Sequence, residues 1–231
     1  MQLLVSVADA SEAQAAVAGG ADIVDAKNPR HGSLGAVPAQ VLHAIHARVG
    51  SRTRTSAALG DQTDAAGAAL AARMAGDAGM DYGKMGFRGA SSAAQVRRVA
   101  AAAGPAGCGM QLVLVAYADW AHVGAPEPRR VLEAAVAVRA AGVLMDTVIK
   151  GPTLLDYLTS AGVAEWISLV HEAGLLAAVA GSLGASDLVT VRDAGADLAG
   201  VRGAACDGGR SGRVSRARVE ALSAALRGAP V

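Results

Sequence analysis

Lysine is rare in this sequence, and its positions suggest chemistry. The chain has 18 arginines and only three lysines: Lys27, Lys84 and Lys150. Wherever an ordinary surface cation suffices, the chain uses arginine, so lysine is retained where arginine cannot replace it. An arginine stays protonated, whereas a lysine amine can form an imine or accept a proton once burial or a nearby cation lowers its pKa. The three lysines therefore indicate carbonyl chemistry, unless each one merely pairs with a local acid.

Two aspartates accompany these lysines at short spacing. Asp25 lies two residues before Lys27, so both side chains point to one face of an extended strand. Asp146 lies four residues before Lys150. Carboxylates beside amines can orient them and relay protons during imine chemistry. The alternative is a pair of buried ion pairs that only fix the strand ends.

Two glycine-containing segments near the C-terminus are candidates for phosphate binding. Gly181 and Ser182 follow the seventh apolar run of the chain, and Arg202 and Gly203 follow the eighth. Backbone N–H groups of such loops often bind phosphate in barrel proteins, and an arginine adds a bidentate contact. The alternative is that these glycines only form ordinary turns, in which glycine is common.

These residues are placed by a regular alternation of short apolar runs with longer alanine-rich segments. The runs predict strands at 3–7, 22–26, 53–59, 82–86, 111–116, 143–147, 175–180 and 198–201. The segments between them, with apolar positions at three- and four-residue spacing, predict helices at 9–18, 38–48, 64–78, 91–103, 128–140, 160–173, 185–194 and 215–227. Eight such units predict an α/β protein, a single (β/α)8 TIM barrel over residues 1–231, with no linker to a second domain. A doubly wound open sheet is the alternative. In a barrel, all three lysines lie at the C-terminal ends of strands, where barrel enzymes carry their active sites.

Composition excludes several classes of function. Apolar residues make up 52% of the chain and the net charge is +1, which argues against disorder. The chain lacks the basic stripe with interleaved aromatics that is typical of nucleic-acid binding. It also has no uncharged apolar run long enough for a membrane span. The N-terminus lacks a secretory signal, so we expect a cytoplasmic protein. Neither the two cysteines nor the five histidines have metal-ligand spacing, so no metal is predicted. The alanine-rich helices are compatible with a homo-oligomer, and the Gly- and Arg-rich segment 207–213 is either a lid or plain surface.

The chain resembles the (5-formylfuran-3-yl)methyl phosphate synthase family along nearly its whole length. The motifs that carry the resemblance are LLVS at 3–6, GGADIVDAKNP at 19–29, GSLGA at 32–36, YAD at 117–119, MDTVIK at 145–150, AGS at 180–182 and GVRGAAC at 200–206.

The resemblance implies a (β/α)8 barrel that acts in methanofuran or other furan biosynthesis. Two glyceraldehyde 3-phosphate molecules condense to a furan with loss of one phosphate and two waters. The family's imine-forming lysine falls on Lys27, its proton-transferring lysine on Lys84, and its further acid and base positions on Asp25, Asp146 and Lys150. No cofactor is implied, because the imine serves as the electron sink.

Two other functions stay open at this stage. Another imine-forming aldolase or triose phosphate lyase would explain Lys27 and Lys84, and its product would lack the near-ultraviolet absorbance of a furan. A non-catalytic phosphate-ligand-binding barrel would bind its ligand without forming an imine. The three lysines argue against this second hypothesis, because a site that only binds phosphate could use arginine in their place.

Overall fold

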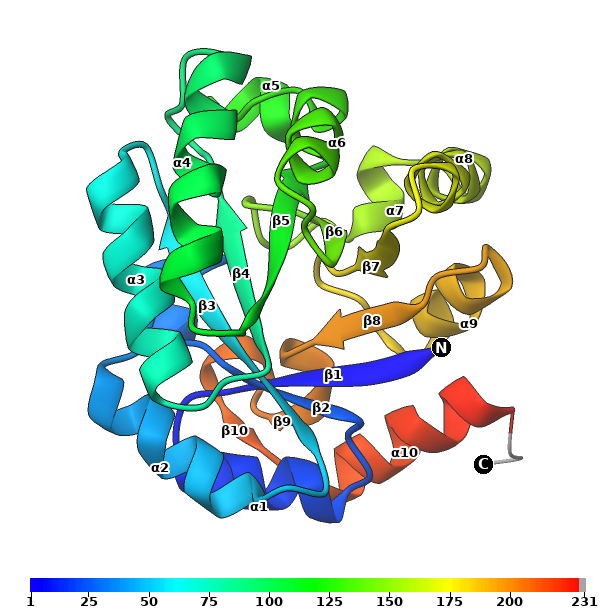
Figure 1. Ribbon diagram of the computed structural model, residues 1–231. Helices are drawn as coiled ribbons and strands as arrows, with labels where there is room; N and C mark the ends of the chain where they lie inside the picture. The colour runs from blue at the N-terminus through cyan, green and yellow to red at the C-terminus, as the bar shows by residue number, and fades with distance from the viewer. Residues whose placement is uncertain (229–231) are drawn as a thin grey trace.

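The computed structural model describes residues 1–228 and shows eight parallel strands closed into a barrel, which confirms the predicted fold (Figure 1). The strands are β1 (Gln2–Val7), β2 (Ile23–Ala26), β3 (Arg54–Asp61), β4 (Tyr82–Gly86), β5 (Gln111–Tyr117), β6 (Gly142–Asp146), β7 (Leu176–Val179) and β8 (Leu198–Val201). They pair in sequence order, and β8 pairs with β1 to close the ring. The open-sheet alternative is thereby excluded.

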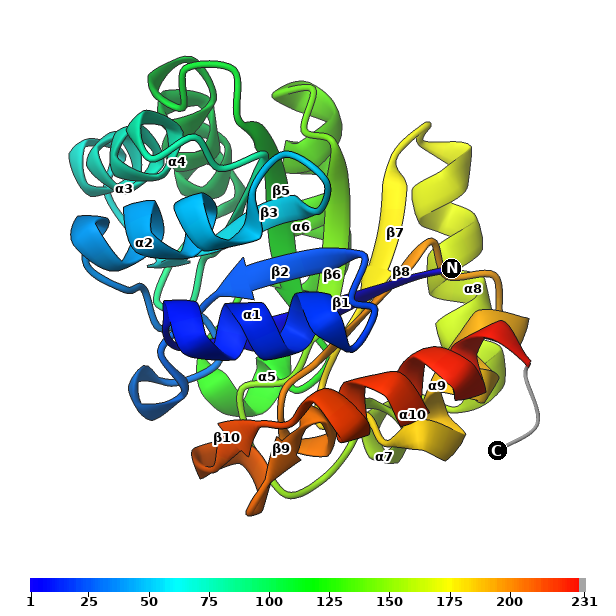
Figure 2. The same cartoon turned by 90° about the horizontal axis from the view of Figure 1, so that it is seen from below.

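Helices follow the strands and surround the barrel. They are α1 (Ala10–Ala18), α2 (Ala39–Val49), α3 (Ala65–Asp77), α4 (Ala93–Ala106), α6 (Pro128–Ala137), α8 (Ser160–Glu172), α9 (Ala185–Asp193) and α10 (Arg216–Arg227). Side-chain caps start several of them: Asp9, Asp64 and Ser92 each accept a hydrogen bond from a backbone N–H of the first turn. Figures 1 and 2 show α3 and α4 packed side by side and α10 beside α9.

The apolar core has two parts. The larger part lies between the strands and the helices, and it includes Val5, Ile45 and Leu114. The smaller part lies inside the barrel, where Leu4, Val115 and other inward-facing side chains meet. Side chains alternate between these two environments because successive residues of a strand point to opposite faces.

The structure departs from the expected elements in the connections. Two one-turn helices, α5 (Trp120–Val123) and α7 (Leu154–Tyr157), follow β5 and β6 before the main helices begin. Helix α4 continues to Ala106, and α6 ends at Ala137, before the predicted boundary. The segment after β8 is built from η2 (Gly203–Ala205), β9 (Cys206–Asp207), η3 (Gly209–Ser211) and β10 (Arg213–Val214). The segment 207–213 therefore lies in a two-stranded hairpin, at the edge of the barrel in Figure 2.

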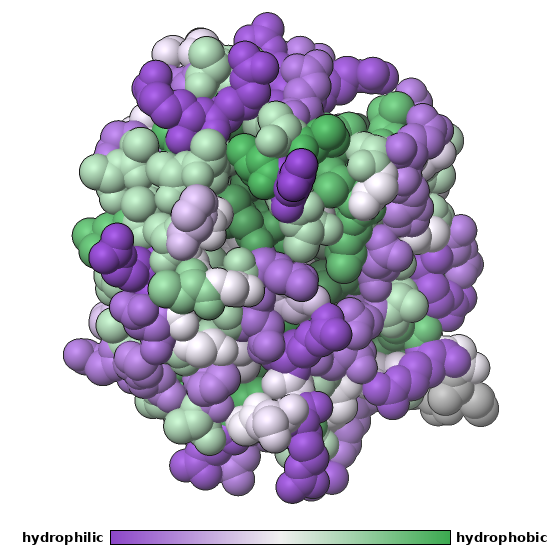
Figure 3. All heavy atoms as spheres, viewed as in Figure 1, coloured by the Kyte–Doolittle hydropathy of each residue, from purple (hydrophilic) through white to green (hydrophobic). Residues whose placement is uncertain are grey.

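On the face shown in Figure 3, polar side chains lie mainly along the lower part and the right-hand edge. On the side where α6 and α8 lie, apolar side chains gather around a hollow. A groove there is lined by residues that include Trp120, Met145 and Trp166. None of the helices described within residues 1–228 has both the length and the apolar character needed to cross a membrane.

Candidate active site

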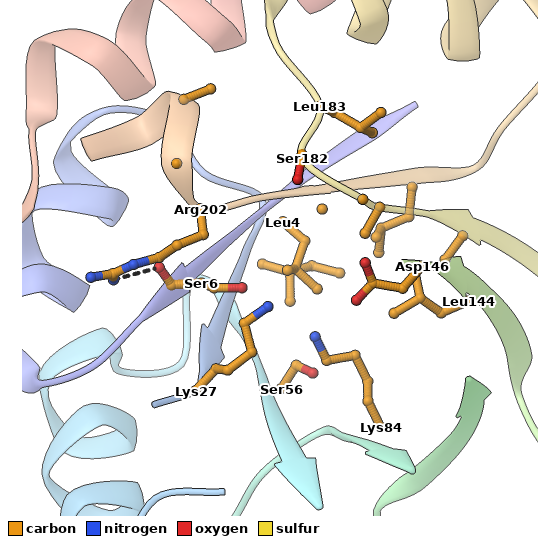
Figure 4. A pocket seen from close by; sticks show the side chains of 18 of the residues that line it. Leu4, Ser6, Lys27, Ser56, Lys84, Leu144, Asp146, Ser182, Leu183 and Arg202 are labelled. Carbon is orange, nitrogen blue, oxygen red and sulfur yellow. Dashed lines mark hydrogen bonds between the residues drawn. The ribbon is translucent and has the colours of Figure 1, made fainter. Parts of the chain in front are cut away.

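A cavity of about 310 Å³ opens inside the barrel at the C-terminal ends of the strands. Its lower wall consists of apolar side chains from the barrel interior, such as Leu4 and Leu144. Its upper wall is polar and contains all three lysines. In the close view, the side chains of Lys27 and Lys84 approach each other, and Asp146 faces them across the cavity (Figure 4).

Asp25 is held by side chains from neighbouring strands. The register places it beside Ser6 of β1 and Ser56 of β3. Ser6 Oγ donates a 2.8 Å hydrogen bond to Asp25 Oδ2, and Lys84 Nζ forms a 2.7 Å ion pair with the same oxygen. The other carboxylate oxygen, Oδ1, is buried without a hydrogen-bond partner among residues 1–228. One side of the carboxylate is therefore anchored and the other is free to accept a proton or a hydrogen bond.

Lys27 is an amine suited to attack on a carbonyl. It is 7% exposed and lines the cavity, and within residues 1–228 its Nζ has no hydrogen-bond or ion-pair partner. Burial, together with the positive charge of Lys84, lowers its pKa to about 8, against the opposing effect of Asp146 and Asp25. With this pKa about a tenth of the amine is neutral at pH 7, far more than for an ordinary lysine, and imine formation requires the neutral form.

Asp146 lies opposite Lys27 at the end of β6. Its Oδ1 accepts a 2.7 Å hydrogen bond from the backbone N–H of Thr147 and lies 3.5 Å from Lys150 Nζ. Burial acts to raise the pKa of Asp146, but Lys150 and Lys27 outweigh it, so the pKa is lower than usual. Asp146 is thus a carboxylate that faces two amines at the cavity wall.

The segment that carries Lys150 is tied to the barrel by Asp119. This buried side chain accepts hydrogen bonds from the backbone N–H groups of Val148 and Ile149, the latter at 2.7 Å. The Lys150 ammonium also donates to the carbonyl oxygen of Thr147. Its side chain is 24% exposed, so Lys150 lies at the rim of the cavity and not at its base.

The predicted phosphate-binding residues of the β7–α9 loop line the cavity wall. Gly181 has φ +116°, and a Cβ atom at that position would lie 3.0 Å from the side chain of Thr147. Ser182 has φ +55°, a left-handed conformation that is uncommon for a residue other than glycine. Such strained backbone recurs at functional sites.

Arg202 lies at the cavity wall, but its guanidinium points into the protein. It forms a buried ion pair with Glu12 and donates to the carbonyl oxygen of Ser6 at 3.0 Å, a bond drawn in Figure 4. It also donates to the carbonyl oxygens of Arg210 and Gly212, at 3.3 and 2.9 Å. Its donors are directed to these acceptors, so Gly203 is the member of this predicted pair that faces the cavity with a free surface.

The predicted catalytic residues Lys27, Lys84, Asp25, Asp146 and Lys150 are thus brought to one site. Lys27, Lys84, Asp146 and Lys150 line the cavity itself, and Asp25 is reached through Lys84 and Ser6.

Two further cavity residues were not among the predicted site residues. Ser56 lines the cavity and its hydroxyl is buried without a partner among residues 1–228. A polar residue inside the predicted apolar strand 53–59 was the available signal. Arg210 lines the cavity from the hairpin after β8. Nothing in its local sequence distinguishes it from the other arginines nearby.

Residues 1–228 contain no cluster of three or more His, Cys, Asp or Glu side chains arranged to hold a metal ion. Cys206 is buried behind the site, and burial raises the pKa of its thiol.

Sequence comparison places the chain among close relatives. A protein-family model described as 4-HFC-P synthase matches residues 3–223. The (5-formylfuran-3-yl)methyl phosphate synthase of Methanopyrus kandleri is 39% identical over 92% of both chains. The enzyme of the same name from Methanocaldococcus jannaschii is 38% identical over 96% of this chain and 98% of its own. A protein of Streptomyces griseus named as putative for the same activity is 38% identical over 98% of this chain and 94% of its own.

Structural comparison finds the same barrel in distant enzymes. A 3-hexulose-6-phosphate synthase superposes with a TM-score of 0.61 at 21% identity over 100% of both chains. A phosphoribosyl anthranilate isomerase from Thermus thermophilus gives a TM-score of 0.64 at 13% identity over 99% of both chains. At these identities the likeness concerns the fold alone.

Proposed function

Because the chain belongs to the (5-formylfuran-3-yl)methyl phosphate synthase family, whose members are lyases, we propose that it condenses two glyceraldehyde 3-phosphate molecules through an imine on Lys27. The product is (5-formylfuran-3-yl)methyl phosphate, with release of one phosphate and two waters. The observation that carries the proposal is the buried Lys27 amine, with a pKa of about 8, beside the Lys84–Asp25 pair.

The first step joins the substrate to the protein. The neutral Lys27 amine adds to the aldehyde carbon, and loss of water gives the imine. Protonation of the imine makes it an electron sink, so the proton on the adjacent carbon becomes acidic. Asp146 faces Lys27 from across the cavity, and its negative charge stabilises the iminium cation.

The second step removes that proton. Lys84 and Asp25 are joined by the 2.7 Å contact, and both are shielded from solvent. A proton taken from carbon can pass across this contact, and the unpartnered Asp25 Oδ1 supplies a second acceptor. The resulting enamine expels phosphate from its third carbon or attacks the aldehyde of the second triose.

Later steps require protons at oxygen. Aldol addition, ring closure and dehydration release the two waters, and hydrolysis of the imine frees Lys27. Lys150 lies at the rim, where the departing hydroxyl or phosphate leaves, and donates a proton there. The Gly181–Ser182 turn and Gly203 provide backbone N–H groups for the phosphate that is retained. In this scheme Arg202 serves the phosphate site by fixing the loop that follows Gly203.

The test is incubation of the protein with glyceraldehyde 3-phosphate, followed by ultraviolet absorbance, phosphate release and mass analysis. A furaldehyde chromophore with one phosphate released per product is expected. In parallel, borohydride reduction during turnover is expected to leave a triose adduct on Lys27.

Two results would contradict the proposal in different ways. An adduct on Lys27 without a chromophore would indicate an aldolase or triose phosphate lyase with another product. Binding of the triose phosphate without an adduct or a chromophore, by folded protein, would indicate a barrel that binds phosphate ligands without catalysis.

The pathway is also part of the proposal. We place the product in methanofuran or a related furan metabolite, and the location of the reaction in the cytoplasm. The partners proposed are small triose phosphates.

A further inference from the structure

Arg210 and Arg202 both line the cavity, but they contact different groups: Arg202 pairs with Glu12, whereas Arg210 contacts only backbone carbonyl oxygens. Its guanidinium donates to the carbonyl oxygen of Gly32 at 2.7 Å and to that of Pro29 at 3.5 Å. Among residues 1–228 no carboxylate lies within ion-pair distance of it. A guanidinium has five N–H donors, so several remain for another partner.

The place of Arg210 directs those donors toward the cavity. Its backbone packs on Gly203, where a Cβ atom would lie 3.6 Å from the Arg210 nitrogen. Its side chain reaches from the hairpin after β8 to the segment that follows β2, and it lines the cavity on the way. The charge of Asp146 acts on Arg210, and Arg210 in turn helps to lower the pKa of Lys27. Arg210 is thus a cationic group at the cavity wall, between the segments that follow β8 and β2.

The hairpin that carries Arg210 is attached to the barrel on both of its sides. Arg202, fixed by Glu12, donates to the carbonyl oxygens of Arg210 and Gly212. On the outer side, Arg213 pairs with Asp9. The sequence left open whether the segment 207–213 is a lid or plain surface. In the structure it is a hairpin that side-chain contacts hold on both sides.

We propose that Arg210, which lacks a carboxylate partner and faces the cavity above Gly203, binds a phosphate monoester of the substrate. The inference rests on the proposed function in so far as the ligand is a triose phosphate. The two arginines at this end of the site have different roles: Arg202 positions the hairpin, and Arg210 contacts the anion. The Gly32 and Pro29 carbonyl oxygens hold the guanidinium in the orientation in which its remaining donors face the ligand.

The chemistry gives a reason for a second phosphate contact. Two triose phosphates enter the reaction and only one phosphate is retained, so the site handles two anions in turn. The Gly181–Ser182 turn lies on the β7 side of the cavity, whereas Arg210 reaches across toward β2 and Lys27. Arg210 therefore contacts an anion near the imine-forming amine, which the β7 turn alone does not.

The experiment measures binding of glycerol 3-phosphate, a phosphate monoester without a carbonyl, by calorimetry. The variants are Arg210→Gln and Arg210→Lys, with Arg213→Gln as the matched control. Arg213 is on the same hairpin, but its side chain is 64% exposed and pairs with Asp9 at the surface. Thermal unfolding of each variant checks that the hairpin is intact.

We expect Arg210→Gln to weaken binding by about 10- to 100-fold, as the loss of a charge-assisted contact predicts. Arg210→Lys should lose less, and Arg213→Gln should stay within about twofold of the parent chain, as for exposed pairs. Equal binding by Arg210→Gln and the parent chain would overturn the inference. Equal weakening by Arg210→Gln and Arg213→Gln would overturn it too, because the effect would then belong to the hairpin.

The readout is independent of turnover. If the parent chain binds glycerol 3-phosphate through Arg210 but forms no furan, the proposed function fails and the phosphate site stands. If furan forms and Arg210→Gln binds the probe normally, the function stands and this inference fails.

Discussion

Two buried ion pairs lie near the mouth of the barrel, Lys84–Asp25 and Arg202–Glu12, and they are satisfied to different degrees. In both pairs each side chain is at most 6% exposed. The Arg202 guanidinium is completed by three backbone carbonyl oxygens, and Glu12 also accepts from the backbone N–H of Ala8. The Lys84–Asp25 pair leaves Asp25 Oδ1 unpartnered.

This difference distinguishes Arg202–Glu12, which holds the fold together, from Lys84–Asp25, for which we propose a role in the reaction. A saturated pair offers no free donor or acceptor to a ligand, and removal of one partner leaves an uncompensated buried charge. An unsaturated pair that lines a cavity keeps lone pairs and protons available to a substrate. Burial and short distance are common to both, so neither alone distinguishes the pair that we propose takes part in catalysis.

The largest expected effect concerns Lys27, which the unsaturated pair serves. Lys27→Arg should lower turnover by at least about 10³-fold and abolish the borohydride adduct, because a guanidinium cannot form the imine. Glycerol 3-phosphate binding and thermal unfolding control for the integrity of the site. Turnover near the parental rate would contradict the scheme.

The next effect is on stability. Arg202→Met should lower the free energy of unfolding by about 3–5 kcal/mol, because Glu12 is left buried without a counter-charge. Lys84→Met should cost clearly less, since Asp25 keeps its bond to Ser6 and the nearby charge of Lys27, while activity is lost. Urea unfolding gives both values.

The double variant Glu12→Gln/Arg202→Met checks the cause, because it removes the buried charge and should regain part of the loss. Equal destabilisation by Lys84→Met and Arg202→Met would end the distinction between the two pairs.

The pH dependence should be smaller but directional. Imine formation on Lys27, trapped with cyanoborohydride, should rise with pH and level off above about 8, because only the neutral amine reacts. Lys84→Met removes a cation that lowers this pKa, so its profile should shift to higher pH. Asp146→Asn removes a negative charge that raises the pKa of Lys27, so the pH profile of this variant should shift to lower pH. Shifts in the same direction would refute this account of the site's charges.

The lowered pKa of Lys27 also makes the stability of the fold depend on pH. The pKa of Lys27 falls from 10.5 to about 8 in the folded chain. Between these values the unfolded chain binds more protons, so this residue makes the free energy of unfolding rise with pH in that window.

The smallest expected effect concerns Ser56, whose hydroxyl is buried in the cavity wall without a partner. Ser56→Ala should lower kcat/KM by about 10-fold through loss of one substrate hydrogen bond, with no loss of stability. Ser223→Ala, a buried serine near Gly20 and away from the cavity, is the control and should leave kcat/KM unchanged. A stability loss in Ser56→Ala without a change in kcat/KM would assign the hydroxyl to the fold.

Local sequence was sufficient for the barrel and for grouping most of the proposed catalytic residues at one site. The alternation of apolar runs and helical segments specifies the order of the elements, and parallel closure brings the strand ends together. Lys27, Lys84 and Asp146 could therefore be grouped, because all three belong to strands of the same ring or follow them directly. Asp146 ends β6 and Lys27 comes directly after β2, whereas Lys84 lies in the middle of β4 and not at its predicted end. Helix boundaries shifted where single turns such as α5 and α7 formed within connections.

The roles of the arginines could not be derived in this way. Arg202 follows β8 directly, in the position from which barrel loops often bind phosphate, yet its guanidinium turns inward to Glu12, 190 residues away in the chain. Arg210 sits in a segment without periodicity, and its contact with Gly32 joins loops 178 residues apart.

The sequence by itself determined which chemistry is available: three lysines in or shortly after strands, among 18 arginines, with aspartates at short spacing from two of them. The tertiary structure alone decided which charges are neutralised and which face the cavity. Spacing along a strand is a local property that the backbone geometry fixes. The partner of a buried charge depends on how distant segments pack, because a long side chain turns toward whichever acceptors the folded chain places within reach.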